Sequence, residues 1–162
     1  MQRLYIFFIV FFAASCNAST YYVVRHAEKV NSPSMSIDVP LTEGGKQRAE
    51  ALKKTLAKEG ITQIYSTNYN RTRATVMPIA EDRNIRIQLY DPRDTSFVSR
   101  LKKINKAQVL IVGHSNTVDD IVNQLSGTHT VPGDLPDSQY GDLFVIRKKG
   151  NKTTVEKKHF GL

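Results

Sequence analysis

Internal disulfide bonds are the first feature that this sequence excludes, because it holds a single cysteine, Cys16, among 162 residues. The fold therefore depends on its core rather than on oxidative cross-links. Internal repeats and low-complexity linkers are also missing. With 40% hydrophobic and 23% charged residues, the composition is typical of a globular protein and predicts no disordered tract. A chain of this length favours one domain with a substantial core.

Patterns that bind metals or nucleic acids are missing too. No Cys, His and Asp residues occur at the spacings that metal sites use. The net charge is +8, but basic pairs such as Lys53-Lys54 and Lys157-Lys158 are not interleaved with aromatic residues. We therefore expect no metal, no cofactor and no nucleic-acid partner. The basic excess is typical of solvated faces and would give a mild attraction for anions.

The only long apolar run, residues 4–14, is too short to span a bilayer comfortably. Because it follows Arg3 and precedes small residues, it is typical of a secretory signal peptide, although a retained short anchor is an alternative. Cys16 comes after Ala-Ala-Ser, which resembles a bacterial lipobox, where the Cys becomes the lipid-bearing first residue; Ala13 replaces the usual Leu. We expect residues 1–18 to be a signal peptide, cleaved before Cys16 or near Ala18.

Both cleavage sites predict an exported protein, periplasmic or anchored as a lipoprotein, whose single mature domain spans residues 19–162. A lipidated Cys16 would place this domain on a membrane surface.

Apolar strands alternate with amphipathic helices along the rest of the chain. Strands are expected at residues 21–24, 61–65, 85–89, 107–112, 143–147 and 155–159, and helices at 46–58, 70–82, 95–105 and 117–125. This alternation predicts an α/β fold: a three-layer α/β/α sandwich with a mostly parallel central sheet, helices on both faces and an antiparallel edge strand. Ligands bind at the carboxyl ends of the strands in such sheets.

Two histidines directly follow predicted strands. Arg25 and His26 come after the strand YYVV, and His114 follows VLIVG. If the two strands are neighbours, His26 and His114 face each other across one pocket. Two strand-end histidines in the same context, one of them beside an arginine, favour a functional site over solvated turns.

A third segment, residues 64–77, adds two arginines at the start of a helix, Arg71 and Arg73. Cations in a first helical turn oppose the helix dipole, so a bound anion would offset the cost. The guanidinium fork matches two oxygens of a phosphate or carboxylate. One of the two arginines is expected to be solvated, and the pattern alone does not say which.

Four motifs together resemble those of the histidine phosphatase superfamily, the phosphoglycerate mutase-like proteins, and in particular its small branch 1 phosphatases. Residues 25–28 (RHAE) resemble its RHG signature, and residues 40–49 (PLTEGGKQRA) resemble its PLTxxGxxQA segment, with Arg-Ala in place of Gln-Ala. Residues 65–75 resemble its YSSxxxRAxxTA segment, and residues 113–115 its GHS motif. The four motifs occur in the family's order and cover nearly the whole mature chain.

The resemblance implies a role for each matching residue. His26 matches the nucleophile, Arg25 and Arg71 match the phosphate-binding arginines, and His114 matches the second pocket histidine. Arg73 is then the solvated arginine. Neutral imidazole can attack phosphorus to form a phosphohistidine, and the arginines and His114 can stabilise the transferring group without a metal.

The acid that protonates the leaving group is less determined, because its position varies in the family. Asp91 follows a predicted strand and is the preferred candidate for the general acid and base, with Asp94 and Glu28 as lesser candidates. Asn116 opens the helix after His114 and is a further candidate for phosphate binding. If no acid reaches the pocket, the protein would resemble the superfamily's phosphohistidine-protein phosphatases, whose nitrogen leaving group needs less help.

We therefore expect an exported, metal-independent phosphatase that hydrolyses a small phosphomonoester, or a phosphohistidine, through a phosphohistidine at His26. A non-catalytic phosphate-binding module and a phosphomutase are the alternatives. Residues 31–39 and 127–140 are expected to form the pocket rim.

Overall fold

The computed structural model of the chain describes residues 18–31 and 38–161. Residues 1–17, which hold Cys16 and nearly all of the predicted signal peptide, lie outside the described residues, as do residues 32–37 of the predicted rim. Export and lipidation therefore stay predictions. Within the part that is described, no helix has the length and apolar character needed to cross a membrane.

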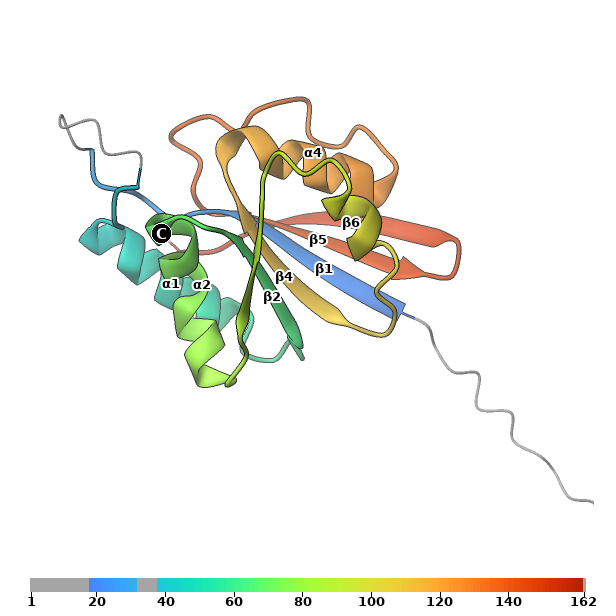
Figure 1. Cartoon of the computed structure of the whole chain (residues 1–162), viewed down its shortest axis with the longest axis horizontal. Coiled ribbons are helices and arrows are strands. Elements are labelled where there is room, and N and C mark those ends of the chain that lie inside the picture. Colours follow the sequence, from blue (N-terminus) through green and yellow to red (C-terminus); the bar gives the residue numbers. More distant parts are fainter. Residues whose placement is uncertain (1–17, 32–37, 162) are drawn as a thin grey trace, which may run out of the picture.

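Six strands form one sheet in the order β3-β2-β4-β1-β5-β6 (Figure 1). Their bounds are Ala18–Arg25 for β1, Gln63–Thr67 for β2, Ile87–Tyr90 for β3, Gln108–Gly113 for β4, Asp142–Lys149 for β5 and Lys152–His159 for β6. Strands β3, β2, β4 and β1 pair in parallel, whereas β5 pairs antiparallel with both β1 and β6. The prediction of a parallel sheet with antiparallel strands at one edge is confirmed.

Helices cover both faces of the sheet (Figure 1). They are α1 (Glu43–Thr55), α2 (Asn70–Asp82), α3 (Phe97–Leu101) and α4 (Ser115–Ser126). Because side chains alternate along a strand, Tyr21 and Val23 pack with α3 and α4, while Tyr22 and Val24 pack with α1 and α2. This alternation produces the predicted three-layer sandwich.

Helix α3 is much shorter than the predicted helix at residues 95–105. Tyr21 donates a hydrogen bond from its hydroxyl to the Leu101 carbonyl (2.9 Å), and Ser19 donates to the Ile104 carbonyl (3.1 Å). Both bonds tie the chain after Leu101 to β1, and Lys106 then turns with a positive φ of 56°. Tertiary contacts therefore end a helix that local sequence would continue.

The segment after β1 is fastened to the start of α1. Thr42 caps α1 by accepting a hydrogen bond from the Gly45 amide (2.9 Å), and the Thr42 amide donates to the Glu28 carbonyl (2.9 Å). Glycine is needed at position 45, since a Cβ there would lie 2.2 Å from the Glu28 oxygen. The chain just beyond His26 is thereby held in one place.

Strands β1 and β4 are neighbours, which is the condition for their two histidines to meet. Arg25 lies opposite Gly113 in the register, and the His26 amide donates to the Gly113 carbonyl (3.0 Å). The side chain after each strand therefore emerges at the same edge of the sheet.

Candidate active site

A pocket of about 450 Å³ opens where β1 and β4 end. The rings of His26 and His114 lie inside it, with centroids 5.6 Å apart. The lining residues are Arg25, His26, Lys29, Tyr69, Arg71, Pro92, Arg93, His114, Ser115, Asn116, Thr117, Asp120 and Asp137. The structure thus brings together Arg25, His26, Arg71 and His114, the four residues that the sequence motifs single out.

His26 is oriented by the backbone beside it. Its Nδ1 lies 2.7 Å from the Ala27 carbonyl oxygen, which can only accept, so Nδ1 carries the hydrogen. The Nε2 atom of a neutral ring then keeps its lone pair. The Ala27 amide in turn donates to the Thr75 hydroxyl on α2 (2.9 Å), which fixes the carbonyl that holds the ring.

Burial keeps His26 neutral. Only 4% of the residue is exposed, and desolvation lowers the pKa of its imidazole to about 3. The bond to Ala27 opposes this shift, while the charges of Arg25 and Arg71 lower the pKa further. An imidazole with a low pKa and a free Nε2 is suited to attack phosphorus at any pH near neutrality.

His114 is oriented by two buried threonines. Its Nε2 lies 2.9 Å from the Thr67 hydroxyl, which donates to the Thr72 hydroxyl (3.0 Å). The Thr72 hydroxyl itself donates a hydrogen bond to the carbonyl oxygen of Thr67 or of Tyr69 (both 2.9 Å). Because the only hydroxyl hydrogen of Thr67 is donated to Thr72, the Thr67 oxygen accepts a hydrogen bond from the imidazole, and His114 carries its hydrogen on Nε2.

The other nitrogen of His114 faces Arg71. The Arg71 NH2 group lies 3.4 Å from Nδ1 and can only donate, which agrees with a bare Nδ1. Burial, and then the charges of Arg71 and Arg25, lower the pKa of His114 to about 4. A phosphate dianion would reverse this electrostatic balance, since it favours a protonated His114 that donates from Nδ1.

Arg25 is held by the loop at residues 136–140. Its NH1 donates to the Pro136 carbonyl (2.8 Å), its NH2 donates to Asp137 Oδ1 (2.9 Å), and its guanidinium lies 4.4 Å from the centre of the Tyr140 ring. The buried Nε of Arg25 has no hydrogen-bond acceptor among the residues that the structure describes. A ligand oxygen could accept from it.

Arg71 and Arg73 have different surroundings. Arg71 lines the pocket with its guanidinium 4.4 Å from the centre of the Tyr69 ring, and desolvation lowers its pKa. Arg73 donates to the side-chain oxygens of Asn68 (2.7 Å) and Asn70 (2.8 Å) at the surface. The structure therefore places Arg71, and not Arg73, where a pocket anion would bind.

Asp38, a residue of the predicted rim, binds the first residue of α2. Asp38 accepts a hydrogen bond from the Asn70 amide through Oδ1 (2.5 Å), at the end of the helix where amides lack partners. The carboxylate also opposes the positive charges of the first turn. Asp38 thus helps to fix the helix that carries Arg71.

The three predicted acids all lie away from the pocket lining. Arg93 binds the Asp91 carboxylate at 3.0 and 3.1 Å and holds the pKa of that carboxyl below its usual range. Asp94 binds Arg100 (2.7 Å), and Glu28 binds Arg48 (2.7 Å). Asp91 is thus an ionised surface group that lines a neighbouring hollow. The geometry does not bring it to the histidines, which departs from the preferred prediction.

The carboxylates that do line the pocket are Asp120 and Asp137. Sequence reasoning missed both: Asp120 lies six residues beyond His114 on α4, and Asp137 lies in a loop without periodicity. Thr67 was also missed, although it lies within the segment that carries Arg71. Asn116 lines the pocket as expected, in a kink of α4 with φ −95° and ψ 18°.

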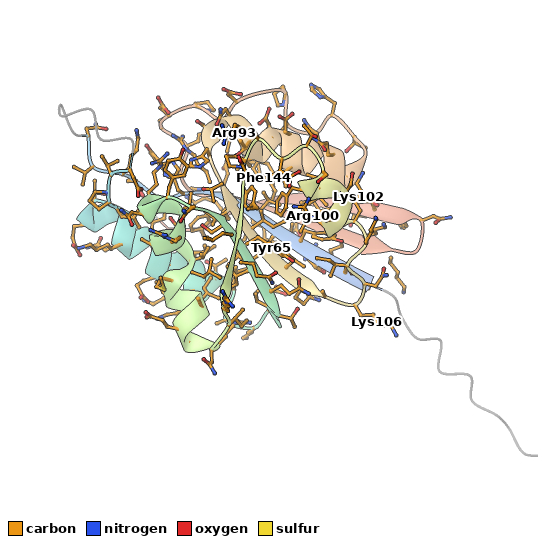
Figure 2. The ribbon with its side chains drawn as sticks, viewed as in Figure 1. Tyr65, Arg93, Arg100, Lys102, Lys106 and Phe144 are labelled. Carbon is orange, nitrogen blue, oxygen red and sulfur yellow. The ribbon has the colours of Figure 1, made fainter. Side chains whose placement is uncertain are left out.

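The pocket holds a surplus of fixed positive charge around two neutral imidazoles. Figure 2 shows Arg93, a residue of the pocket lining, near the top of the view and far from Lys106. In the described ranges, no three His, Cys, Asp or Glu side chains gather closely enough to hold a metal ion. Arginine donors and a buried nucleophilic imidazole can bind a phosphoryl group and receive it.

Comparison with known proteins links this geometry to a family. Residues 21–93 match the family model described as histidine phosphatase superfamily (branch 1). Phosphoserine phosphatase 1 of Hydrogenobacter thermophilus is 36% identical over 69 residues, which are 40% of this chain and 33% of that protein. Probable phosphoglycerate mutase GpmB of Serratia proteamaculans is 34% identical over 76 residues, 44% of this chain and 35% of that protein.

The matches to these two curated relatives thus span about a third of their length. A solved structure of the protein histidine phosphatase SixA in complex with tungstate shares the fold, with a TM-score of 0.68. It is 16% identical, and the match covers 86% of this chain and 96% of that one.

Proposed function

We propose that the chain is a phosphatase of the histidine phosphatase superfamily, branch 1, whose family model matches residues 21–93, and that it transfers a phosphoryl group to His26 and then to water. One observation carries the proposal: the Ala27 carbonyl accepts the Nδ1 hydrogen of His26, so that Nε2 is a neutral nucleophile in a pocket that Arg25 and Arg71 also line. The substrate is a small phosphorylated molecule or a phosphorylated protein side chain.

The first step forms a bond between Nε2 of His26 and phosphorus while the bond from phosphorus to the leaving group breaks. The three equatorial oxygens carry negative charge throughout, and Arg25 and Arg71 offer donors for them. His114, once protonated, donates from Nδ1 to the same group. In the second step, water attacks the phosphohistidine, inorganic phosphate leaves, and His26 is neutral again.

The exposure of the described part of the rim supports hydrolysis over mutase activity. The Asp137 side chain, which lines the pocket, is 96% exposed, so this part of the pocket edge is open to solvent. A mutase must instead retain its intermediate in a closed site until the second transfer. A non-catalytic phosphate-binding module is the remaining alternative, since two arginines suffice to bind an anion.

The experiment compares the wild type with His26→Ala on p-nitrophenyl phosphate and on several phosphoesters across a broad pH range. We expect turnover only by the wild type, together with an acid-labile phosphoprotein that is absent from the variant. If the wild type turned over none of the substrates, the proposal of an enzyme would be refuted, and a non-catalytic phosphate-binding module would be the remaining function. Phosphoryl transfer to a second acceptor in place of phosphate release would identify a mutase.

We further propose that the chain is exported and that Cys16 carries lipid. The sequence of residues 1–16 supports this proposal, with its basic start, apolar run and small residues before the cysteine. The mass of the mature N-terminus decides between the cleavage sites: an unmodified chain that begins at Ser19 would exclude lipidation.

A further inference from the structure

Two segments that carry six lysines, residues 102–106 and 148–152, flank the start of β1, at the opposite end of this strand from the pocket. We call them the lysine cluster: Lys102, Lys103, Lys106, Lys148, Lys149 and Lys152. Five are exposed and Lys148 is half-buried. Figure 2 shows Lys106 beside the first residues of β1.

The contacts of β1 explain why lysines from two distant segments meet here. On one side, Ala18 and Ser19 lie opposite Lys149 and Lys148 in the antiparallel register, and Lys149 in turn pairs with Lys152. On the other side, the Thr20 amide donates to the Ala107 carbonyl (2.9 Å), next to Lys106. The first residues of β1 therefore lie between the two halves of the lysine cluster.

Negative charge is scarce around the lysine cluster. No aspartate or glutamate occurs in residues 101–108 or 148–155, all of which are described. The nearby carboxylate of Glu59 accepts a hydrogen bond from the Tyr22 hydroxyl (2.6 Å), and Tyr22 belongs to the face that packs with α1 and α2. Six like charges repel one another, and an extended anionic surface would relieve that repulsion.

We infer that the lysine cluster docks the domain on anionic lipid headgroups. The inference rests on the proposed export of the chain, not on its catalytic activity. The occupant is indicated by the neighbouring sequence, because Cys16 lies two residues before Ala18, the residue of β1 that pairs with Lys149, and the apolar run of residues 4–14 comes shortly before Cys16. A lipid on Cys16 and the lysine cluster would contact one surface, which is the two-signal arrangement that stable anchoring requires.

This docking fixes the direction of the pocket. β1 has eight residues and rises about 3.3 Å per residue, so Arg25 at its carboxyl end lies about 23 Å along the strand from Ala18 at its start. The pocket would then face the aqueous phase, and the substrate would be water-soluble rather than a lipid in the same membrane.

The test uses the chain from Ala18 onward, because every residue of the three hydrophobic clusters lies within residues 21–160. Binding is measured to phosphatidylcholine vesicles with and without about 30 mol% phosphatidylglycerol. One variant replaces Lys103, Lys149 and Lys152 by Gln. Its control replaces Lys46, Lys53 and Lys54 of α1 by Gln, which changes the net charge equally.

We expect the wild type to bind only the anionic vesicles. Each lysine near an anionic surface contributes roughly fivefold in affinity, so the triple variant should bind about 100-fold more weakly and the control within about threefold. Equal losses in both variants, or no binding by the wild type, would overturn the inference. So would binding to single-stranded DNA without binding to vesicles.

The orientation of the pocket on the membrane is tested separately, by the turnover of vesicle-bound protein. Vesicle-bound protein should hydrolyse p-nitrophenyl phosphate as fast as free protein, and a loss of turnover on binding would overturn the orientation. If free protein shows no turnover, the proposed function fails, while the vesicle measurement still decides the docking surface.

Discussion

Replacing Thr67 by valine removes one hydroxyl from the hydrogen-bond chain that orients His114. Thr67 and Thr72 are both fully buried, and valine has nearly the shape of threonine, so the change alters polarity rather than volume. The variant loses the acceptor for the His114 Nε2 hydrogen and the donor to Thr72. No protein group then favours the hydrogen on Nε2, and the ring can turn or change tautomer against Arg71.

The size of the effect follows from the bonds that are lost. A buried donor without a partner costs about 1 to 3 kcal/mol, and the free energy of unfolding should fall by about that amount. A hydrogen bond to a charged group contributes about 1.5 to 3 kcal/mol, which applies if His114 is protonated when the phosphoryl group is transferred. The kcat/KM of Thr67→Val should therefore fall roughly 10- to 100-fold.

The measurement is steady-state hydrolysis of p-nitrophenyl phosphate, well below the thermal midpoint of each variant. Thr67→Ser keeps the hydroxyl and should retain most of the activity. Thr72→Val should resemble Thr67→Val, because Thr67 would then donate to His114 and force the hydrogen onto Nδ1, against the donors of Arg71. A folded Thr67→Val protein whose kcat/KM stays within about twofold of the wild type would refute the reasoning.

Three further results are expected. Folding lowers the pKa of His26 to about 3 and that of His114 to about 4, so the unfolded chain binds more protons than the folded chain below pH about 6.5. The free energy of unfolding should therefore fall by up to about 1.4 kcal/mol per pH unit per histidine as the pH is lowered from 6.5 to 4. In urea titrations, a variant with Gln at both positions should show a flatter dependence on pH, and an unchanged slope would contradict the assignment. Arg71→Ala should lower kcat/KM at least about 100-fold and Arg73→Ala less than about threefold, since only Arg71 lines the pocket; similar losses in steady-state assays would count against the assignment. Asp137→Asn should lower the inhibition constant of inorganic phosphate by up to about fivefold, because an exposed carboxylate no longer competes for the buried arginine; weaker inhibition would mean that this aspartate organises the site.

The layers of the fold follow from the sequence because they depend on periodicity. The apolar run of β4 and the helices on each side of it predict a buried parallel strand, and both features occur. Helix α3 could not be predicted in the same way, because Ser19 and Tyr21, some 80 residues earlier, bind the carbonyl groups where it ends. Local propensity contains no information about that contact.

Some residues of the candidate site could likewise be placed from local sequence patterns, whereas others depend on contacts with distant segments. His26 and His114 could be placed together from the sequence, since each directly follows a strand and ligands bind where strands end. The environment of Arg25 could not, because it comes from Asp137 and Tyr140 in a loop over 110 residues away. Asp91 occupies a strand end too, but Arg93, two residues later, binds its carboxylate. A strand end brings a residue to the pocket edge, and neighbouring charges decide where its side chain goes.

The leaving group of the substrate can be inferred from where the acids are. An acid must be protonated near the leaving atom, but Asp91 is held ionised by Arg93, and Asp137 is paired with Arg25. Of the two carboxylates in the pocket lining, Asp120 makes no ion pair with any residue that the structure describes, and it is exposed on α4. If Asp120 supplies the proton, Asp120→Asn should slow alkyl phosphates by about 100-fold and leave p-nitrophenyl phosphate, whose leaving group needs little protonation, within about threefold. Equal rates of the variant and the wild type on alkyl phosphates would instead mean that no carboxylate acts as acid, and would favour phosphohistidine substrates, whose nitrogen leaving group can take its proton from water.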